Sequence, residues 1–318
     1  MFLIIVALAA RSFGIIFFND HIYYYDAKID KNGVVELDAK DAANVTDLPQ
    51  KSRRVTDFAL LKSDTTETDL SYFQWTLQTD DIEGTIIAQP LTTADIACQN
   101  TVLAHKRGLY GLFGFTQWSL SLFTHFPPSI TYMIRNGPTK VTYKNVPDAL
   151  KDQLQEKVIS QSCDDEEALK YLDFSLKSAG MVSSECVTNA GIPIEPNKCN
   201  NGKKVSKDLK GYRIGNFYDY SATDVKGLII RFGSILVDDM ILVGWGWSEW
   251  IAAVSQSDYS YKGYRVLIDS DRKYNGYLLF SPSQGTAWFI ISIIFGVVGG
   301  LMIFTGIMIL VCYYCKRV

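Results

Sequence analysis

Cysteine and histidine are the residues of this chain with the greatest potential for chemistry, and both are scarce. The sequence holds six cysteines and three histidines, His21, His105 and His125. Cys98 lies seven residues before His105, and a thiolate beside an imidazole is the pair that cysteine-dependent acyl transfer requires. No G-x-S-x-G, H-E-x-x-H or phosphate-loop motif indicates another catalytic centre.

Four cysteines lie in the body of the chain, Cys98, Cys163, Cys186 and Cys199. An even number in an oxidising compartment predicts two disulfides, and three connectivities are open. A zinc site would need a Cys-x-x-Cys pair or a nearby histidine, and the acidic run Asp164 to Glu167 is interpreted as a solvated helix start. We therefore expect no metal and no cofactor, and a disulfide rather than a free thiol at Cys98.

The first residues of the chain resemble a targeting segment. Met1 to Ala10 is almost wholly apolar and ends at a small-x-small pattern, so residues 1–12 are predicted to be a secretory signal peptide cleaved before Phe13. Arg11 and the apolar run that starts at Phe13 leave two alternatives open, an uncleaved anchor and a buried first strand.

A second apolar segment lies near the other end. Residues 287–311 contain no charged residue over 25 positions, enough for a helix to cross a hydrocarbon core of ~30 Å. Lys316 and Arg317 follow it, which places the tail, residues 312–318, in the cytoplasm. A buried core helix is the alternative. We expect a single-pass type I protein of the secretory pathway, in contact with lipid through residues 287–311, in the plasma membrane or a lysosome- or vacuole-like membrane.

Smaller motifs agree with this topology. Gly296 and Gly300 have the spacing that lets two membrane helices approach, which predicts a possible homodimer. Cys312 and Cys315 are candidates for palmitoylation or are free thiols. Asn44 begins an Asn-Val-Thr glycosylation sequon.

Composition fits a globular body and excludes one class of partner. The chain has 318 residues, of which 47% are hydrophobic, so it can bury a sizeable core. The formal charge is -3 and the pI is near 5.7. Without a basic excess, nucleic acid is not an expected partner.

Several stretches predict regular structure. The short β-branched or aromatic runs Ile241 to Val243, Trp250 to Val254 and Tyr264 to Ile268 predict adjacent strands of an antiparallel sheet. Lys106 to Phe126 predicts a buried helix, and Thr223 to Val237 predicts a helix capped by Thr223 and followed by a strand. His21 to Lys40 predicts two strands joined at an Asn-Gly turn.

The motifs V-G-W-G and G-Y-R-V within residues 241–268 resemble the right-hand lobe of papain-like cysteine peptidases. The resemblance covers most of residues 71–283, with residues 13–70 as an N-terminal β-hairpin and linker. It implies an α+β, two-lobed papain-like fold, with a helical left lobe and an antiparallel β right lobe, plus one transmembrane helix. It also implies the pairings Cys163–Cys199 and Cys98–Cys186.

The same resemblance assigns positions to the peptidase chemistry, and none carries the required group. Tyr110 or Leu112 falls at the nucleophilic cysteine, Asp238 at the histidine, and Ser255 at the orienting asparagine. We therefore expect a membrane-anchored pseudoprotease that binds a peptide or protein without cleaving it. The alternative is an active cysteine-type endopeptidase with a displaced nucleophile, for which Cys98 is the candidate.

Overall fold

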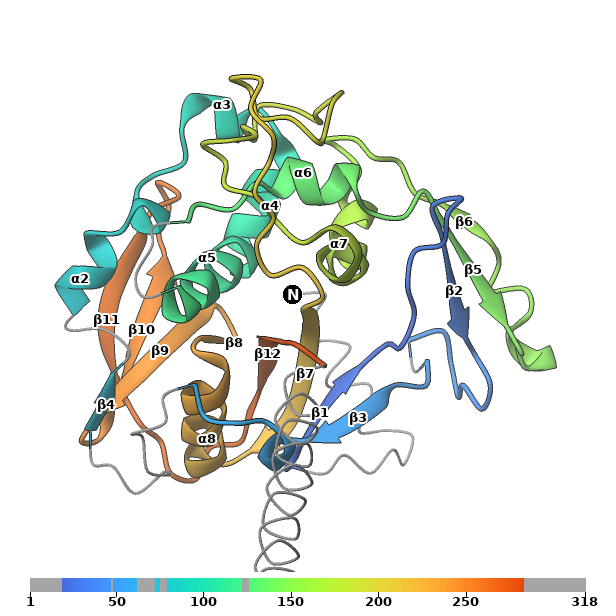
Figure 1. The fold of residues 1–318 in the computed structure, drawn as a ribbon. Coiled ribbons are helices and arrows are strands. Elements are labelled where there is room, and N and C mark those ends of the chain that lie inside the picture. Colours follow the sequence, from blue (N-terminus) through green and yellow to red (C-terminus); the bar gives the residue numbers. More distant parts are fainter. Residues whose placement is uncertain (1–18, 47, 62–71, 75–78, 122–125, 283–318) are drawn as a thin grey trace, which may run out of the picture.

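A large antiparallel sheet forms the middle of the molecule. The computed structural model describes residues 19–46, 48–61, 72–74, 79–121 and 126–282 (Figure 1). Within them the sheet has nine strands, in the order β11-β10-β9-β8-β12-β7-β1-β3, with β4 paired to β9. The strands are β1 (His21–Tyr24), β3 (Lys51–Arg54), β4 (Tyr72–Gln74), β7 (Arg213–Tyr220), β8 (Ile235–Val237), β9 (Met240–Gly246), β10 (Glu249–Ser255), β11 (Tyr261–Leu267) and β12 (Tyr274–Phe280).

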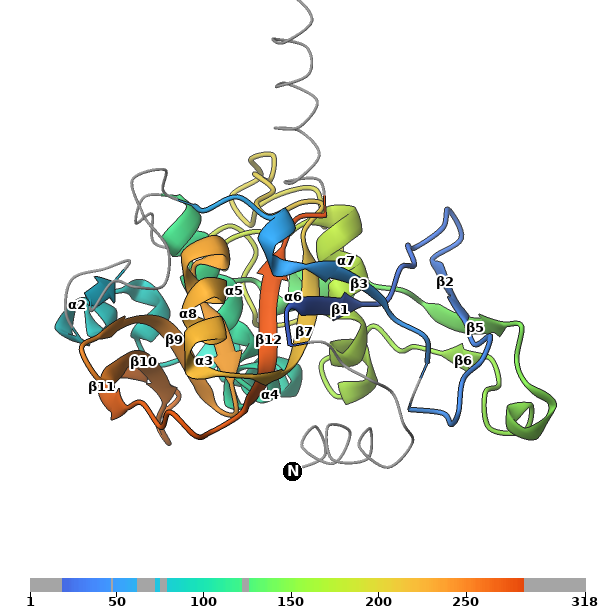
Figure 2. The same cartoon turned by 90° about the horizontal axis from the view of Figure 1, so that it is seen from below.

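Helices cover both faces of this sheet (Figures 1 and 2). Helix α8 packs on one face, and α4, α5, α6 and α7 contribute to the core on the other. The helices of the described residues are α2 (Thr79–Glu83), α3 (Thr93–Ile96), α4 (Gln99–Lys106), α5 (Leu109–Leu120), α6 (Ile130–Arg135), α7 (Leu172–Ala179) and α8 (Ala222–Phe232).

Strand alternation explains why one sheet serves two cores. Successive side chains of a strand point to opposite faces. In β9, Ile241 and Val243 lie in the core that includes α5, whereas Leu242 lies in the core that includes α8. A register shift between β9 and β10 interrupts the alternation after Leu242, so Trp245 also lies in the α8 core. Because both faces are buried, these strands are almost continuously apolar.

The predicted strands and helices of this region are largely confirmed. Strands β9, β10 and β11 pair antiparallel in sequence order. The predicted helix and strand after residue 221 are α8 and β8, but the N-cap is Ser221 rather than Thr223, and its hydroxyl accepts from the Asp224 N–H in a capping box. The predicted helix over 106–126 is divided, because Gly108 has a φ of 72° between α4 and α5.

The predicted hairpin between the first two strands is wrong. β1 joins the large sheet between β3 and β7, whereas β2 (Val34–Asp38) joins a separate three-stranded sheet with β5 (Lys140–Lys144) and β6 (Lys157–Val158). The turn at Gly33 does form, with a φ of 79°. The small sheet stands to one side of the large one (Figures 1 and 2), where β2 and β5 run parallel.

The predicted fold class, a two-lobed papain-like fold plus a transmembrane helix, is not what the structure shows. Two lobes would separate a helical body from a β body, whereas here one nine-stranded sheet is shared by two cores with helices on both faces. V-G-W-G and G-Y-R-V encode only a tight turn and alternating strands, which many antiparallel sheets satisfy.

No helix in the part of the chain that the structure describes combines the length and apolarity needed to cross a membrane. The predicted span 287–311, including Gly296 and Gly300, lies outside the described residues, as do Cys312, Cys315 and the predicted signal peptide, residues 1–12.

Candidate functional site

The candidate site lies where α4 ends and α5 begins. His105 is in the last turn of α4, and Gly108 connects the two helices. An added Cβ at Gly108 would lie 3.1 Å from Leu236 Cδ2, so this connection is pressed against the sheet. The sharp turn therefore brings the N-terminus of α5 to Tyr261 of β11.

His105 is fully buried in a cluster of hydroxyl-bearing side chains. Its Nδ1 lies 3.1 Å from Ser255 Oγ, at the end of β10. The Tyr261 ring packs on the imidazole at a centroid distance of 4.3 Å, and the Tyr110 ring lies at 5.6 Å. Its Nε2 has no hydrogen-bond partner among the described residues. Loss of hydration lowers the pKa of His105 to about 4, which the negative charge of Asp258 opposes only in part.

The phenol of Tyr261 occupies the N-terminus of α5. Its hydroxyl accepts the Gly111 N–H at 3.1 Å and donates to the His105 carbonyl at 3.3 Å. Burial raises the pKa of Tyr261, so the phenol is neutral at all ordinary pH values. An added Cβ on Gly111 would overlap the Ile241 side chain and lie 2.8 Å from Tyr261 Cζ. Side chains thus fill the space in front of this helix end.

The structure brings together two of the four positions that the resemblance singled out. Tyr110 and Ser255 both face His105, while Leu112 is buried in the core beside them. Asp238 is in the turn between β8 and β9, with a φ of 54°, and forms an ion pair with Arg272. That turn lies at the same end of the sheet as Ser255, because Met240 pairs with Val254, but its carboxylate is engaged elsewhere.

Ser255 and His105 are residue types that can act as a nucleophile and its base, but they lack the neighbouring groups that such a catalytic pair requires. A working pair needs a third group that orients the imidazole and donors that stabilise an oxyanion. His105 Nε2 has no such partner in the described part of the chain, and the Gly111 N–H is already bonded to Tyr261. An imidazole whose pKa is about 4 is also a weak base near neutral pH.

Little in the sequence predicts this cluster. The spacing along the chain indicates only Cys98, seven residues away, as a partner for His105, whereas Ser255 is 150 residues away. Tyr261, which blocks the helix end, lies just before the strand predicted to begin at Tyr264. The density of tyrosines after residue 258 was the available signal.

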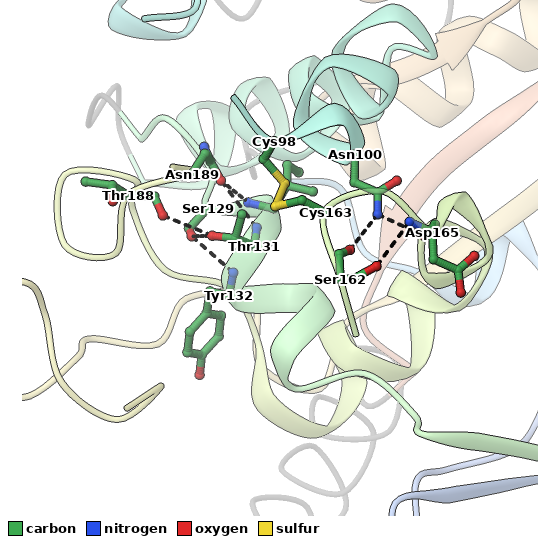
Figure 3. Close-up of a disulfide and its surroundings, with 11 residues drawn as sticks. Cys98, Asn100, Ser129, Thr131, Tyr132, Ser162, Cys163, Asp165, Thr188 and Asn189 are labelled. Atoms are coloured by element: carbon green, nitrogen blue, oxygen red, sulfur yellow. Dashed lines mark hydrogen bonds between the residues drawn. A yellow bond between two sulfur atoms is a disulfide. The ribbon is translucent and has the colours of Figure 1, made fainter. Parts of the chain in front are cut away.

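All four body cysteines are in disulfides, and the predicted pairing is wrong. The bonds are Cys98–Cys163 and Cys186–Cys199. Figure 3 shows the first bond, beside which Asn100 holds the partner segment: its backbone N–H donates to the Cys163 carbonyl at 2.9 Å. Its side-chain amide donates to the carbonyls of Ser162 and Asp165, each at 2.9 Å. Cys98 is therefore not a thiol, which removes the displaced nucleophile that we had considered.

The remaining predicted sites have ordinary structural surroundings. The acidic run 164–167 starts a 3-10 helix, as predicted: Asp165 accepts the Glu167 N–H at 3.0 Å, and Glu167 pairs with Lys157. No group of three or more histidine, cysteine or acidic side chains in the described ranges could hold a metal ion. Asn44 Oδ1 accepts from the Thr46 hydroxyl at 2.6 Å.

In comparisons with known proteins, no family model, no curated protein and no solved structure matches this chain.

Proposed function

We propose that this chain is a non-catalytic binding protein of the secretory pathway that holds an extended peptide segment of a partner protein. It is a pseudoprotease in one sense only: the positions that the papain-like motifs assign to chemistry carry groups that cannot perform it. The lack of catalysis is supported by Tyr261, whose hydroxyl accepts the Gly111 N–H at the start of α5, and the observation that carries the binding role is the outer edge of β11. The two disulfides fit an oxidising compartment.

The outer edge of β11 is suited to bind such a segment. β11 is the last strand on its side of the sheet, at the left of Figure 1. The Gly263 N–H donates outward, to the Glu83 carboxylate, and Ile268 donates inward, to Ser248. By strand alternation, the backbone groups of Arg265 and Leu267 also point outward. Helix α2 packs against β11 and occupies the edge at Gly263, so an added strand would find its hydrogen bonds at Arg265 and Leu267.

Exposed apolar side chains lie at the same end of the sheet. Trp247 is 78% exposed at the tip of the β9–β10 hairpin, and Leu267 is 74% exposed at the end of β11. They are close in the fold because Leu267 pairs with Glu249, two residues after Trp247. Such side chains are typical anchors for a peptide laid along a sheet edge.

The backbone at Trp247 is a second indication of function. Its φ is 51°, in the left-handed region that glycine or asparagine occupies at lower cost in a hairpin turn. A bulky aromatic side chain that is both exposed and strained contributes little to folding, and such outliers concentrate at functional sites. We therefore assign Trp247 to binding.

A partner of different sequence is favoured over a second copy of this chain. Lys262 and Arg265 are exposed on β11, and pairing two copies edge to edge would bring like charges together. A peptide with an acidic residue among apolar ones would meet the same edge favourably. Arg265 lies 3.6 Å from Glu249, a partly exposed ion pair that an acidic ligand can replace.

The test is selection of peptides from a displayed library on the folded full-length protein, followed by anisotropy measurements of affinity. The variant Arg265→Pro removes one outward N–H and leaves the bonds to β10 in place, so we expect a loss of about tenfold or more with folding retained. Arg265→Ala is the matched control, because it removes the side chain and keeps the N–H. Equal affinities for both variants would rule out strand addition.

Trp247→Gly separates binding from folding at the hairpin tip. Glycine relieves the positive φ, so we expect stability to rise by up to about 1 kcal/mol while peptide affinity falls about tenfold or more. A folded protein that selects no peptide, or that cleaves the peptides it binds, would overturn the proposed function.

A further inference from the structure

A strip of lysines follows the second disulfide and is independent of the peptide edge. Residues 198–210 contain five lysines and one aspartate, a local charge of +4 in a chain whose total is -3. The segment runs through the yellow loops at the top of Figure 1. We call Lys198, Lys203, Lys204, Lys207 and Lys210 the lysine strip, and all five are exposed.

The first half of the strip is a rigid hairpin held by backbone bonds. The Cys199 N–H donates to the Lys203 carbonyl at 2.7 Å, and Asn200 donates to the Cys186 carbonyl at 2.7 Å. This arrangement makes Lys198 and Lys204 direct cross-strand partners. Like charges placed opposite each other destabilise a strand pair, so the hairpin holds them together at a cost to folding.

The second half is anchored by buried apolar side chains. Val205 and Leu209 are buried, and Asp208 exchanges two backbone hydrogen bonds of 2.8 Å with Met181. The Asp208 carboxylate is half-buried and accepts from Gln117 of α5 at 3.2 Å, and it forms no ion pair with the lysines of the strip. The backbone is thus fixed while the lysines between these anchors stay exposed.

Few acidic groups compensate the strip. Glu195 pairs with Lys198 at 2.9 Å. Among the described residues, no carboxylate lies within ion-pair distance of the other four lysines. Preorganised ammonium groups that lack counter-charges can bind a polyanion without first breaking ion pairs.

We propose that the lysine strip binds a sulfated polysaccharide. Lys204 to Lys210 spans at most about 20 Å of extended chain, so the sulfates along one flexible polymer can meet several lysines together and release their counterions. An acidic folded protein would need a rigid surface that matches the positions of these lysines. The disulfide that begins the strip forms in the oxidising compartments whose contents meet such polymers.

Binding of size-defined heparin fragments to the full-length protein in uncharged detergent tests the proposal. We expect Lys203→Glu/Lys204→Glu to weaken binding about tenfold or more, and to reduce the salt slope of log Kd by about two. Lys28→Glu/Lys31→Glu makes the same charge change at exposed lysines elsewhere and should leave the affinity within about twofold. Lys203→Arg/Lys204→Arg should bind as tightly as the native protein.

Three outcomes would overturn the proposal. They are equal losses in the two charge-reversed proteins, no heparin binding by a protein with native circular dichroism, and binding to vesicles of anionic phospholipid in place of heparin. Loss of peptide binding in the Arg265→Pro protein with heparin binding retained leaves this inference intact, so the two proposals fail separately.

Discussion

Replacing His105 with phenylalanine should remove a large part of the acid sensitivity of this fold. In the folded protein the pKa of the buried imidazole is about 4, against 6.5 in an unfolded chain. As the pH falls below 6.5, the unfolded state takes up a proton that the folded state cannot accept, so the free energy of unfolding decreases. The loss ends near pH 4, where the folded state is protonated too.

The size of the effect follows from the same two pKa values. At 1.36 kcal/mol for each pKa unit, the gap between 6.5 and about 4 corresponds to about 3 kcal/mol. This contribution is fully present above pH 6.5 and is lost between pH 6.5 and 4. It is a large share of the stability of a typical domain.

Urea unfolding followed by tryptophan fluorescence at pH steps from 7.5 to 4 would measure the loss. Ion pairs hold the pKa values of Asp26 and Glu167 below the ordinary range, so protonation of these carboxylates also destabilises the fold in acid. The quantity of interest is therefore the difference in the free energy of unfolding between the native protein and His105→Phe at each pH. Ser255→Ala is the control, because it removes the hydrogen bond to Nδ1 and keeps the titrating ring. Parallel pH profiles for the native and His105→Phe proteins would refute the reasoning.

The remaining predictions concern two buried contacts. Arg213→Met should lower the free energy of unfolding by about 3–5 kcal/mol, because it removes the partner of the largely buried Asp173 carboxylate, which accepts from Arg213 Nε at 2.9 and 3.0 Å. Adding Asp173→Leu should restore most of the loss, and urea midpoints that show no recovery would contradict this. Gly111→Ala should lower the free energy of unfolding by about 1–3 kcal/mol, because its Cβ would overlap Ile241. Gly191→Ala has open space around it, so thermal melts should show a loss of less than about 0.5 kcal/mol. Equal shifts for the two alanines would show that the helix end is not filled.

Local patterns predicted local structure well. Ile241 to Val243 and Trp250 to Val254 are strands because β-branched and aromatic residues suit a pleated, buried surface. The N-cap of α8 was misplaced by two residues, although Ser221 and Asp224 have the spacing of a capping box. The choice between a two-lobed and a shared-sheet fold depends on which faces are covered, and alternating apolar residues do not specify the partner on either face.

Long-range pairings were beyond the sequence. Four cysteines allow three connectivities, and the pairing implied by resemblance was wrong because Asn100 and the Cys163 segment meet through backbone and side-chain hydrogen bonds that no motif encodes. The meeting of His105 with Ser255 likewise depends on the turn at Gly108 and the register of β10. The sequence shows which residues have reactive side chains, but it does not show which residues surround them in the fold.

One measurement tests the central claim, that this chain binds peptides and does not cleave them. A peptide selected on the folded full-length protein would be incubated with it from pH 4 to 8, and the bound and free fractions would be weighed by mass spectrometry. We predict that the peptide is recovered intact at every pH, bound by the native protein and released by Arg265→Pro. Fragments that accumulate with the native protein and disappear with Ser255→Ala would contradict the account, because the Ser255 and His105 pair would then be catalytic.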